Sequence, residues 1–315
     1  TGSLTVTDAA SNIGTSNPNV LFALGTTGAD GSQQAPLDGN IVFGFAGDDF
    51  LSATGSGVYN YLNGGIGNDG IALSPGSNIV LTGEDSDAIS VTGDFSSVQG
   101  AFPIQATNLV FVAGSGAVTI ADSNVTVASG SYAAAIQPFV DGAYVDASTA
   151  SSPYIFGVGS ADGVFKGGTG NDLFEIGQIL DQDYGIDVIT GRGGNDAYRI
   201  DTSFDSGLGL SIIRASITDL NTGDMFQLES GYRYSINSGI GSGFNASGLT
   251  LNVVSGVRDV ILVASNSEYY LGVEKGSGGT INEFDYIRLG SAVPGTASNL
   301  SGWTYDFNAQ SLTIV

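Results

Sequence analysis

Apolar and polar residues alternate over short runs in this chain, and glycine-rich turns separate the runs. Clear examples are Asp172–Ile176 and Asp196–Ile200, which each follow such a turn. A period of two residues is typical of β-strands that bury one face. No long stretch has the periodicity of an amphipathic helix. The pattern therefore predicts an all-β protein of many short strands.

A phrase of asparagine followed by apolar residues recurs along the first half of the chain. It begins at Asn40, Asn60 and Asn78, and Asn60 stands nine residues before Asp69. The three asparagines are 20 and then 18 residues apart, so two nine-residue halves make one coil. A single coil cannot bury its apolar face alone, and stacked asparagines would form a hydrogen-bonded ladder. We predict a parallel β-solenoid, a β-roll or β-helix, over residues 15–130.

The repeat is interrupted once and then resumes, which divides the chain into five expected parts. After the interruption, longer alternating strands follow the resumed repeat. The parts are an N-terminal strand segment at 1–14, an irregular solenoid with an asparagine ladder at 15–130, a connecting segment at 131–153, a resumed repeat at 154–228, and a β-rich C-terminal region at 229–315.

Three loops share a glycine cluster that ends in Asn-Asp. Glycine lets the backbone turn tightly and point several carbonyl oxygens at one spot, and the aspartate adds an anionic oxygen. Oxygen ligands of this kind suit Ca²⁺, and glycine-aspartate nonapeptide repeats are known to bind it. We therefore predict calcium sites in these loops. Their candidate ligand residues are Gly64, Gly65, Gly67 and Asp69; Gly167, Gly168, Gly170 and Asp172; and Gly191, Gly193 and Asp196.

Further loops are degenerate copies of this pattern, and two interpretations stay open for them. The copies end at Asp49, Asp87 and Asp162. They either bind calcium as well or are solenoid turns that need glycine and asparagine but no metal.

Composition narrows the possible functions. The chain of 315 residues has a net charge of −23, which opposes a compact state unless cations neutralise it and argues against nucleic-acid and anionic-membrane partners. It contains 49 glycines and neither cysteine nor histidine. These absences exclude disulfides, thiolate and histidine metal sites, and Ser-His-Asp triads. No apolar run is long enough to span a bilayer.

At the clean loops the chain resembles the RTX family, which consists of calcium-binding proteins exported by type I secretion in Gram-negative bacteria. Gly167–Ile176 and Gly191–Ile200 match the family's loop and strand, apart from Arg192. Ile217–Leu228 resembles the strand-turn-strand that follows RTX repeats. The resemblance implies that 154–228 is a calcium-binding β-roll, and that an uncleaved secretion signal lies in the C-terminal region.

The resemblance also implies a ligand set and a place of folding. Its carboxylates would be Asp69, Asp172 and Asp196, with Asp162 and Asp187 from the paired half-coils, and main-chain carbonyls would complete roughly six oxygens per ion. The family implies a chain that is unfolded in low-calcium cytosol and folds outside the cell. The carbonyl ligands would come from Gly64, Gly167 and Gly191.

Three functions remain open, and we favour the first. The chain is a secreted structural protein, not an enzyme, which folds on calcium and self-assembles at the cell surface as an S-layer, filament or biofilm-matrix subunit. Its alternating ends, Gly2–Thr7 and Ser311–Val315, are strands of the kind that add to a neighbour's sheet. The second function is a calcium-dependent adhesin that binds surface polysaccharide, and the third is a polysaccharide-active enzyme. The residues considered for these were Tyr232, Tyr234, Tyr269 and Tyr270 for the adhesin, and Asp181, Asp183, Asp201 and Asp205 for the enzyme.

Overall fold

The computed structural model shows an all-β protein. No helix occurs among the residues it describes, so none of them forms a helix that could cross a membrane. The predicted fold class is confirmed: the strands are mostly parallel and lie in long sheets. The described residues are 5–8, 20–24, 41–54, 59–96, 106, 108–114, 116–159, 162–177, 185–200, 212–228, 233–242, 257–274, 284–290, 303–306 and 311–314.

The chain forms two compact units. Unit 1 contains residues 1–157 and 166–170, and unit 2 contains residues 158–165 and 171–315. Several residues considered in the sequence analysis lie outside the described part, namely Asn40, Asp181, Asp183, Asp201, Asp205 and Tyr232.

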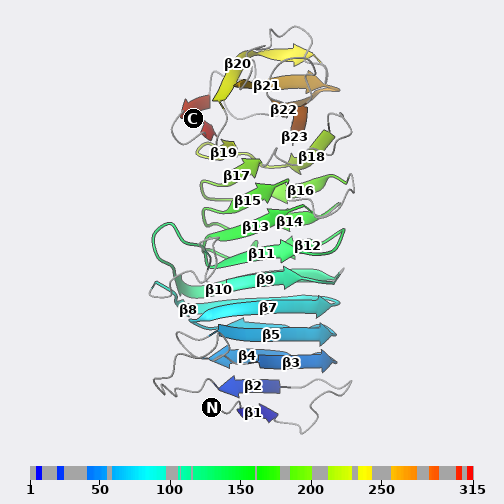
Figure 1. Cartoon of the computed structure of the whole chain (residues 1–315), viewed down its shortest axis with the longest axis vertical. Helices are drawn as coiled ribbons and strands as arrows, with labels where there is room; N and C mark the ends of the chain where they lie inside the picture. Colours follow the sequence, from blue (N-terminus) through cyan, green and yellow to red (C-terminus); the bar gives the residue numbers. More distant parts are fainter. Residues whose placement is uncertain are drawn as a thin grey trace. The chain divides into compact units, whose positions relative to one another are not determined.

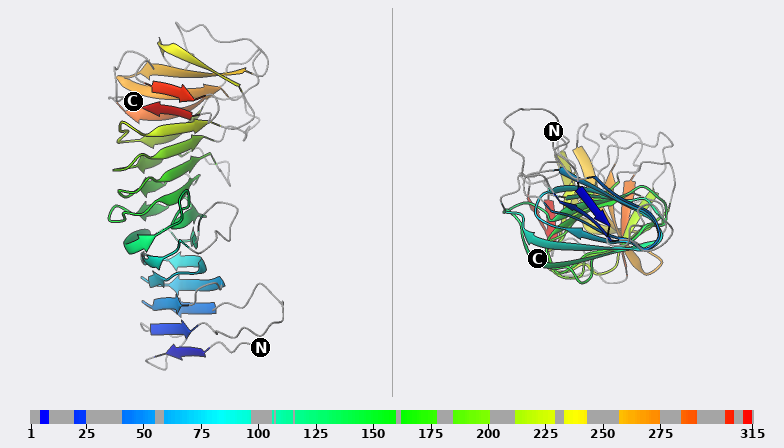
Figure 2. Two further views of the ribbon diagram at one scale, coloured as in Figure 1. Left: turned by 90° about the vertical axis from the view of Figure 1, so that its left-hand side faces the viewer. Right: turned by 90° about the horizontal axis from the view of Figure 1, so that it is seen from below.

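Unit 1 is a parallel coil of two sheets, and the chain alternates between them (Figures 1 and 2). Only β1 runs antiparallel to its neighbour among the strand pairs described in this unit. Sheet A contains β1 (Thr5–Asp8), β2 (Val20–Leu24), β4 (Phe50–Thr54), β6 (Gly70–Leu73), β8 (Asp87–Asp94), β10 (Ala117–Thr126) and β12 (Tyr144–Asp146). Sheet B contains β3 (Ile41–Ala46), β5 (Tyr59–Ile66), β7 (Ser77–Glu84), β9 (Asn108–Val112), β11 (Ala134–Pro138) and β13 (Tyr154–Val158).

The core of unit 1 lies between the two sheets. In sheet B, the register places Leu62, Val80, Val110, Ile136 and Phe156 in one row, and each of them is almost completely buried. Alternation along each strand sends the next residue outward. The binary pattern of the sequence therefore sets both the strand and its buried face.

The predicted asparagine ladder is present beside this core. Asn60 Nδ2 donates to Asn78 Oδ1 at 2.7 Å, and Asn78 Nδ2 donates to Asn108 Oδ1 at 2.6 Å. The ladder ends where Asn108 Nδ2 donates to the carbonyl of Ala133 at 2.6 Å. All three asparagines are buried, so these bonds satisfy amides that would otherwise destabilise the fold.

The coil continues through a segment that lacks the glycine-aspartate repeat. Residues 131–153, interpreted from the sequence as a connection, contain β11 and β12, which pair in parallel with β9 and β10. Their inward residues Ile136 and Val145 are buried like those of the repeat. Alternating apolar residues are therefore enough to extend the coil without the loop motif.

Unit 2 combines parallel and antiparallel pairing. Rings of Phe174, Tyr198, Phe226 and Trp303 pack in sequence, with centroids 5.4 to 5.6 Å apart. One sheet contains β14 (Val164–Lys166), β16 (Asp187–Thr190), β18 (Ile212–Ile217), β23 (Phe284–Gly290), β22 (Glu268–Glu274), β21 (Val257–Ser265) and β20 (Arg233–Ser242). The other contains β15 (Leu173–Ile176), β17 (Ala197–Ile200), β19 (Met225–Leu228), β25 (Ser311–Ile314) and β24 (Trp303–Asp306).

Candidate metal centre

The clean loop of unit 1 carries the chain from sheet B to sheet A. It follows β5 and leads into β6, and Gly65 and Gly67 take positive φ angles of 108° and 130°. Side chains other than hydrogen rarely accept this backbone. The loop places Asp69 at the turn between the sheets, where it is only 2% exposed.

Three predicted ligands of unit 1 form one ladder of buried carboxylates. The N–H of Asp49 donates to Oδ1 of Asp69 at 2.9 Å, and the N–H of Asp69 donates to Oδ1 of Asp87 at 2.9 Å. Asp49 and Asp87, from the degenerate loops, thus occupy the same positions as Asp69. The degenerate loops and the clean loop of unit 1 therefore contribute equivalent aspartates to the same ladder.

Unit 2 repeats the arrangement with a second set of carboxylates. The N–H of Asp172 donates to Oδ1 of Asp196, and the N–H of Asp196 donates to Oδ1 of Asp224, both at 2.9 Å. These three aspartates are at most 1% exposed. We call the two rows, Asp49–Asp69–Asp87 and Asp172–Asp196–Asp224, the aspartate ladders.

The residue before each aspartate makes bonds in the opposite direction. The N–H of Asn68 donates back to Oδ1 of Asp48 at 2.9 Å, and the N–H of Asn195 donates back to Oδ1 of Asn171 at 2.9 Å. The Asn68-Asp69 pair therefore accepts bonds from both neighbouring coils: Asp69 accepts from the N–H of Asp49, and Oδ1 of Asn68 accepts from the N–H of Ser86 at 3.2 Å. Hydrogen bonds to the coil before and to the coil after give a physical reason for an Asn-Asp dipeptide at this turn.

Glycine five residues before the aspartate makes room for the carboxylate. A Cβ on Gly64 would lie 2.4 Å from Oδ2 of Asp69 and 2.2 Å from the carbonyl oxygen of Thr82. A Cβ on Gly191 would lie 2.3 Å from Oδ2 of Asp196. No side chain fits at either position, so this glycine and the aspartate are required together.

Burial raises the pKa values of several carboxylates in the two ladders. Desolvation raises the pKa of Asp69 to about 6, against a hydrogen bond from the Asp49 N–H, and neighbouring carboxylates raise the pKa further. Burial likewise raises the pKa of Asp87 to about 7 and that of Asp196 to about 8. Burial also raises the pKa of Asp224. At neutral pH the ladders therefore favour a bound proton or cation.

The donor chemistry of the ladders fits calcium. The Oδ2 atoms of Asp69, Asp87 and Asp196 are buried and accept no hydrogen bond from any described group. An anionic oxygen in this state suits a hard cation. Within the described residues, however, no three side chains of the Asp, Glu, His or Cys type lie close enough to share a metal. A calcium ion would take one or two carboxylates and draw its other ligands from main-chain carbonyls.

The remaining predicted carboxylates form a separate pair. The N–H of Gly163 donates to Oδ1 of Asp187 at 2.8 Å, and the N–H of Ile186 donates to Oδ1 of Asp162 at 3.3 Å. Asp187 is buried at the start of β16, whereas Asp196 precedes β17 of the other sheet. The structure thus places Asp187 outside the ladder that contains Asp196.

Two further predicted glycines, Gly168 and Gly170, lie against main chain rather than carboxylate. Cβ atoms on Gly168 and Gly170 would lie 2.3 Å from the carbonyl oxygen of Ala150 and 2.4 Å from that of Ser152. Gly167 is buried and Gly193 is half-buried. At Gly168 and Gly170 the absence of a side chain allows neighbouring coils to approach closely.

Two aspartates of the site were missed in the sequence. Asp224 is the last member of the second ladder, and Asp219 accepts the N–H groups of Gly191 and Arg192 at 2.8 and 2.7 Å. The signal for Asp224 was the Gly223-Asp224 pair followed by the alternating Met225–Leu228. This segment has the loop-and-strand order of the repeats, at a spacing of 28 residues from Asp196.

No protein-family model matches the chain, and no curated protein is significantly similar to it. The RTX resemblance of the loops therefore stays a prediction. What the structure adds is the geometry of the loops, in which aspartate, asparagine and glycine have separate roles.

Proposed function

We propose that this chain is a secreted structural protein whose aspartate ladders take calcium, and which self-assembles at or outside the cell surface of a Gram-negative-type bacterium. The proposal is supported chiefly by the Oδ2 atoms of Asp69, Asp87 and Asp196, which are buried and accept no hydrogen bond from any described group. They stand at equivalent turns of a repeated coil. A cation bound there stabilises the stacking of coils.

Charge gives the physical reason for calcium. The net charge of −23 and the closely stacked carboxylates both oppose folding. An ion that binds only the folded state adds RT ln(1 + [L]/Kd) to its stability. Folding would therefore occur where calcium is plentiful, as outside a cell. Asp69 and Asp87 in unit 1 and Asp196 in unit 2 would hold the ions, together with main-chain carbonyls.

The test compares stability with calcium and with a chelator. We expect calcium to raise the midpoint of urea unfolding of the wild-type chain at pH 7.5. Asp69→Asn and Asp196→Asn should each lose part of this gain and the double variant most of it, while Asp94→Asn, at an exposed aspartate outside the ladders, should keep it. Equal midpoints of the wild-type chain in calcium and chelator would refute the calcium proposal.

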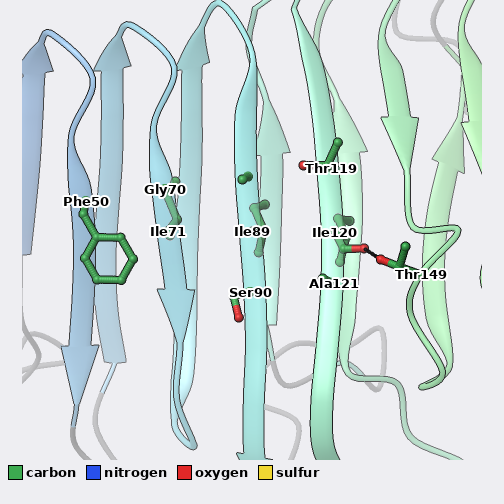
Figure 3. A pocket seen from close by; sticks show the side chains of 10 residues that line it. Phe50, Gly70, Ile71, Ile89, Ser90, Thr119, Ile120, Ala121 and Thr149 are labelled. Carbon is green, nitrogen blue, oxygen red and sulfur yellow. Dashed lines mark hydrogen bonds between the residues drawn. The ribbon is translucent and has the colours of Figure 1, made fainter. Parts of the chain in front are cut away.

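A second candidate function is glycan binding, which a groove on sheet A favours. The groove has a volume of about 290 Å³, and small residues such as Gly70, Ser90 and Ala121 line it (Figure 3). The ring of Phe50, 43% exposed, stands at one end, and Thr149 lies at the other. An exposed ring beside hydroxyl groups can stack on a sugar.

A glycan array decides this second candidate. Saturable binding of one polysaccharide that is lost in Phe50→Ala and kept in Phe139→Ala, at an exposed ring outside the groove, would support an adhesin. The absence of any saturable signal would exclude the groove as a glycan site.

A further inference from the structure

The outer face of sheet B in unit 1 is unusually apolar for so acidic a protein. Side chains that alternate with the buried row point outward from four successive strands. Most are half-buried, and Phe43, at the end of the sheet, is 40% exposed. We call this surface the apolar face, and its residues are Phe43, Tyr61, Ile79, Leu81, Leu109 and Phe111.

The register places these residues on one surface, with the uncharged Asn63 between Phe43 and Leu81. Tyr61, Ile79 and Leu109 are direct neighbours across β5, β7 and β9, and Leu81 is paired with Phe111. Aromatic rings are in contact at both ends of the apolar face. Phe43 packs on Tyr61 with ring centroids 5.8 Å apart, and Phe111 stacks on Phe139 at 4.8 Å.

The apolar face lacks the charge that the rest of the chain carries. The positions of β5, β7 and β9 that carry the apolar face hold no Asp, Glu, Lys or Arg; the exposed acid of these strands, Glu84, lies at the end of β7, beyond Leu81. In unit 2, the outward row of β15, β17 and β19 carries the ion pair of Glu175 and Arg199. On sheet A of unit 1 the outward residues of β8 are Ala88, Ser90, Thr92 and Asp94, none of which is a large apolar residue. Large apolar side chains that are neighbours across successive strands are thus a feature of sheet B, whereas on sheet A Phe50 is followed by small residues such as Gly70 and Ala88.

We propose that the apolar face is the surface through which one copy of this chain binds a second copy. Two chains of charge −23 repel each other, so contact is favourable where neither side presents a carboxylate. Two such faces pack sheet on sheet, about 10 Å apart, with apolar side chains between them. This proposal rests on the proposed self-assembly and names its surface.

The size of the apolar face sets the strength of the contact. Four or five strands about 4.8 Å apart give a surface of roughly 300 Å². A stable dimer needs about 800 Å² per partner. A single contact is therefore weak and concentration-dependent, and because it joins the same face of both copies, it forms a dimer.

The test places one charge on either side of the same coil. Leu81 on β7 points out from sheet B, and Ser90 on β8 points out from sheet A. In sedimentation velocity with calcium, we expect the wild-type chain and Ser90→Glu to associate alike. Leu81→Glu and Phe111→Glu should weaken association at least tenfold while keeping the wild-type circular dichroism spectrum.

The outcomes separate this proposal from the proposed function. Wild-type chain that stays monomeric at millimolar concentration, or folded Leu81→Glu and Phe111→Glu that both associate like the wild type, overturns the apolar face as the interface. Failure of calcium to stabilise the chain overturns the calcium proposal alone, provided that association still depends on Leu81. If a folded Leu81→Glu loses association and a folded Ser90→Glu loses it equally, the effect is general repulsion and the apolar face is not the interface.

Discussion

Glycine, asparagine and aspartate have different structural roles in each glycine-aspartate turn. Gly64 leaves space for the carboxylate, Asn68 accepts or donates bonds on the outer side of the coil, and Asp69 accepts the N–H of the coil before it. These roles follow from the size and donor set of each residue. Calcium chemistry alone would explain the aspartate but neither the asparagine nor the buried position of Gly64.

The glycine role gives the first prediction. In Gly64→Ala the new methyl group overlaps Oδ2 of Asp69 and the carbonyl of Thr82, so the free energy of unfolding should fall by about 2 to 3 kcal/mol. Gly142→Ala is the control, because a Cβ there meets nothing within 4 Å although φ is +69°. Its cost is limited to about 1 kcal/mol of backbone strain. Urea unfolding measures both, and equal losses would contradict the proposed contact.

The raised pKa values give a prediction for pH. The pKa of Asp69, Asp87 and Asp196 rises from 3.8 to about 6, 7 and 8 on folding, so the folded state binds more protons than the unfolded state between pH 4 and 8. Stability in chelator should therefore fall as pH rises through this window. Calcium replaces the proton and should flatten or reverse the slope. A stability that rises from pH 5 to pH 8 in chelator would contradict the assigned shifts.

At the scale of the element, side-chain ladders hold the coils in register. The asparagine ladder runs beside the apolar core, and the aspartate ladder runs along the turn. A slip of one residue would turn the buried row outward and break every rung at once. The two ladders and the core therefore specify the same alignment of strands.

The asparagine ladder can be tested by removing its middle rung. Asn78→Ala leaves the buried amides of Asn60 and Asn108 without their shared partner and should cost about 2 to 4 kcal/mol in unfolding free energy. Asn63→Ala on the outward side of β5 is the matched control and should cost under about 1 kcal/mol. If both variants unfold at the same urea concentration, the ladder contributes nothing specific.

The sequence predicted the coil well because its signals are local and periodic. Alternation identified the strands, and the asparagine spacing identified the register that joins Asn60 to Asn78. Coil length was harder to predict, since the spacing from Asn78 to Asn108 is 30 residues and the extra residues have no periodic pattern. The glycine-aspartate loops are likewise predicted by a local pattern. The hydrogen bonds of their aspartates are not, because the N–H donor lies on a neighbouring coil and is not part of the motif.

The C-terminal end of the second ladder shows a further limit of sequence reasoning. Asp224 was assigned to a strand-turn-strand after the repeats, but it is the next member of the ladder that contains Asp196. Its loop lacks the full glycine cluster, and only Gly223 remains directly before the aspartate. Asp224 belongs to the ladder because of its position in the stack of coils, and that position depends on packing between residues distant in the sequence.

At the scale of the whole molecule, charge opposes both folding and assembly. Because the chain carries a net charge of −23, self-association at a fixed, saturating calcium concentration should strengthen when salt rises from about 0.05 to about 0.5 M, since screening shortens the range of repulsion. Sedimentation velocity at fixed protein concentration measures the effect. Association that weakens as salt is added would show that attraction between charges, and not the apolar face, holds the copies together.

The central claim is that the aspartate ladders bind calcium, and a crystal structure grown in millimolar calcium tests it most directly. We predict anomalous density about 2.3 to 2.6 Å from Oδ2 of Asp69 or Asp87 and of Asp196, absent from crystals grown with chelator. Calcium-grown crystals without such density, in which Oδ2 of these aspartates contacts only water or protein atoms, would contradict the account.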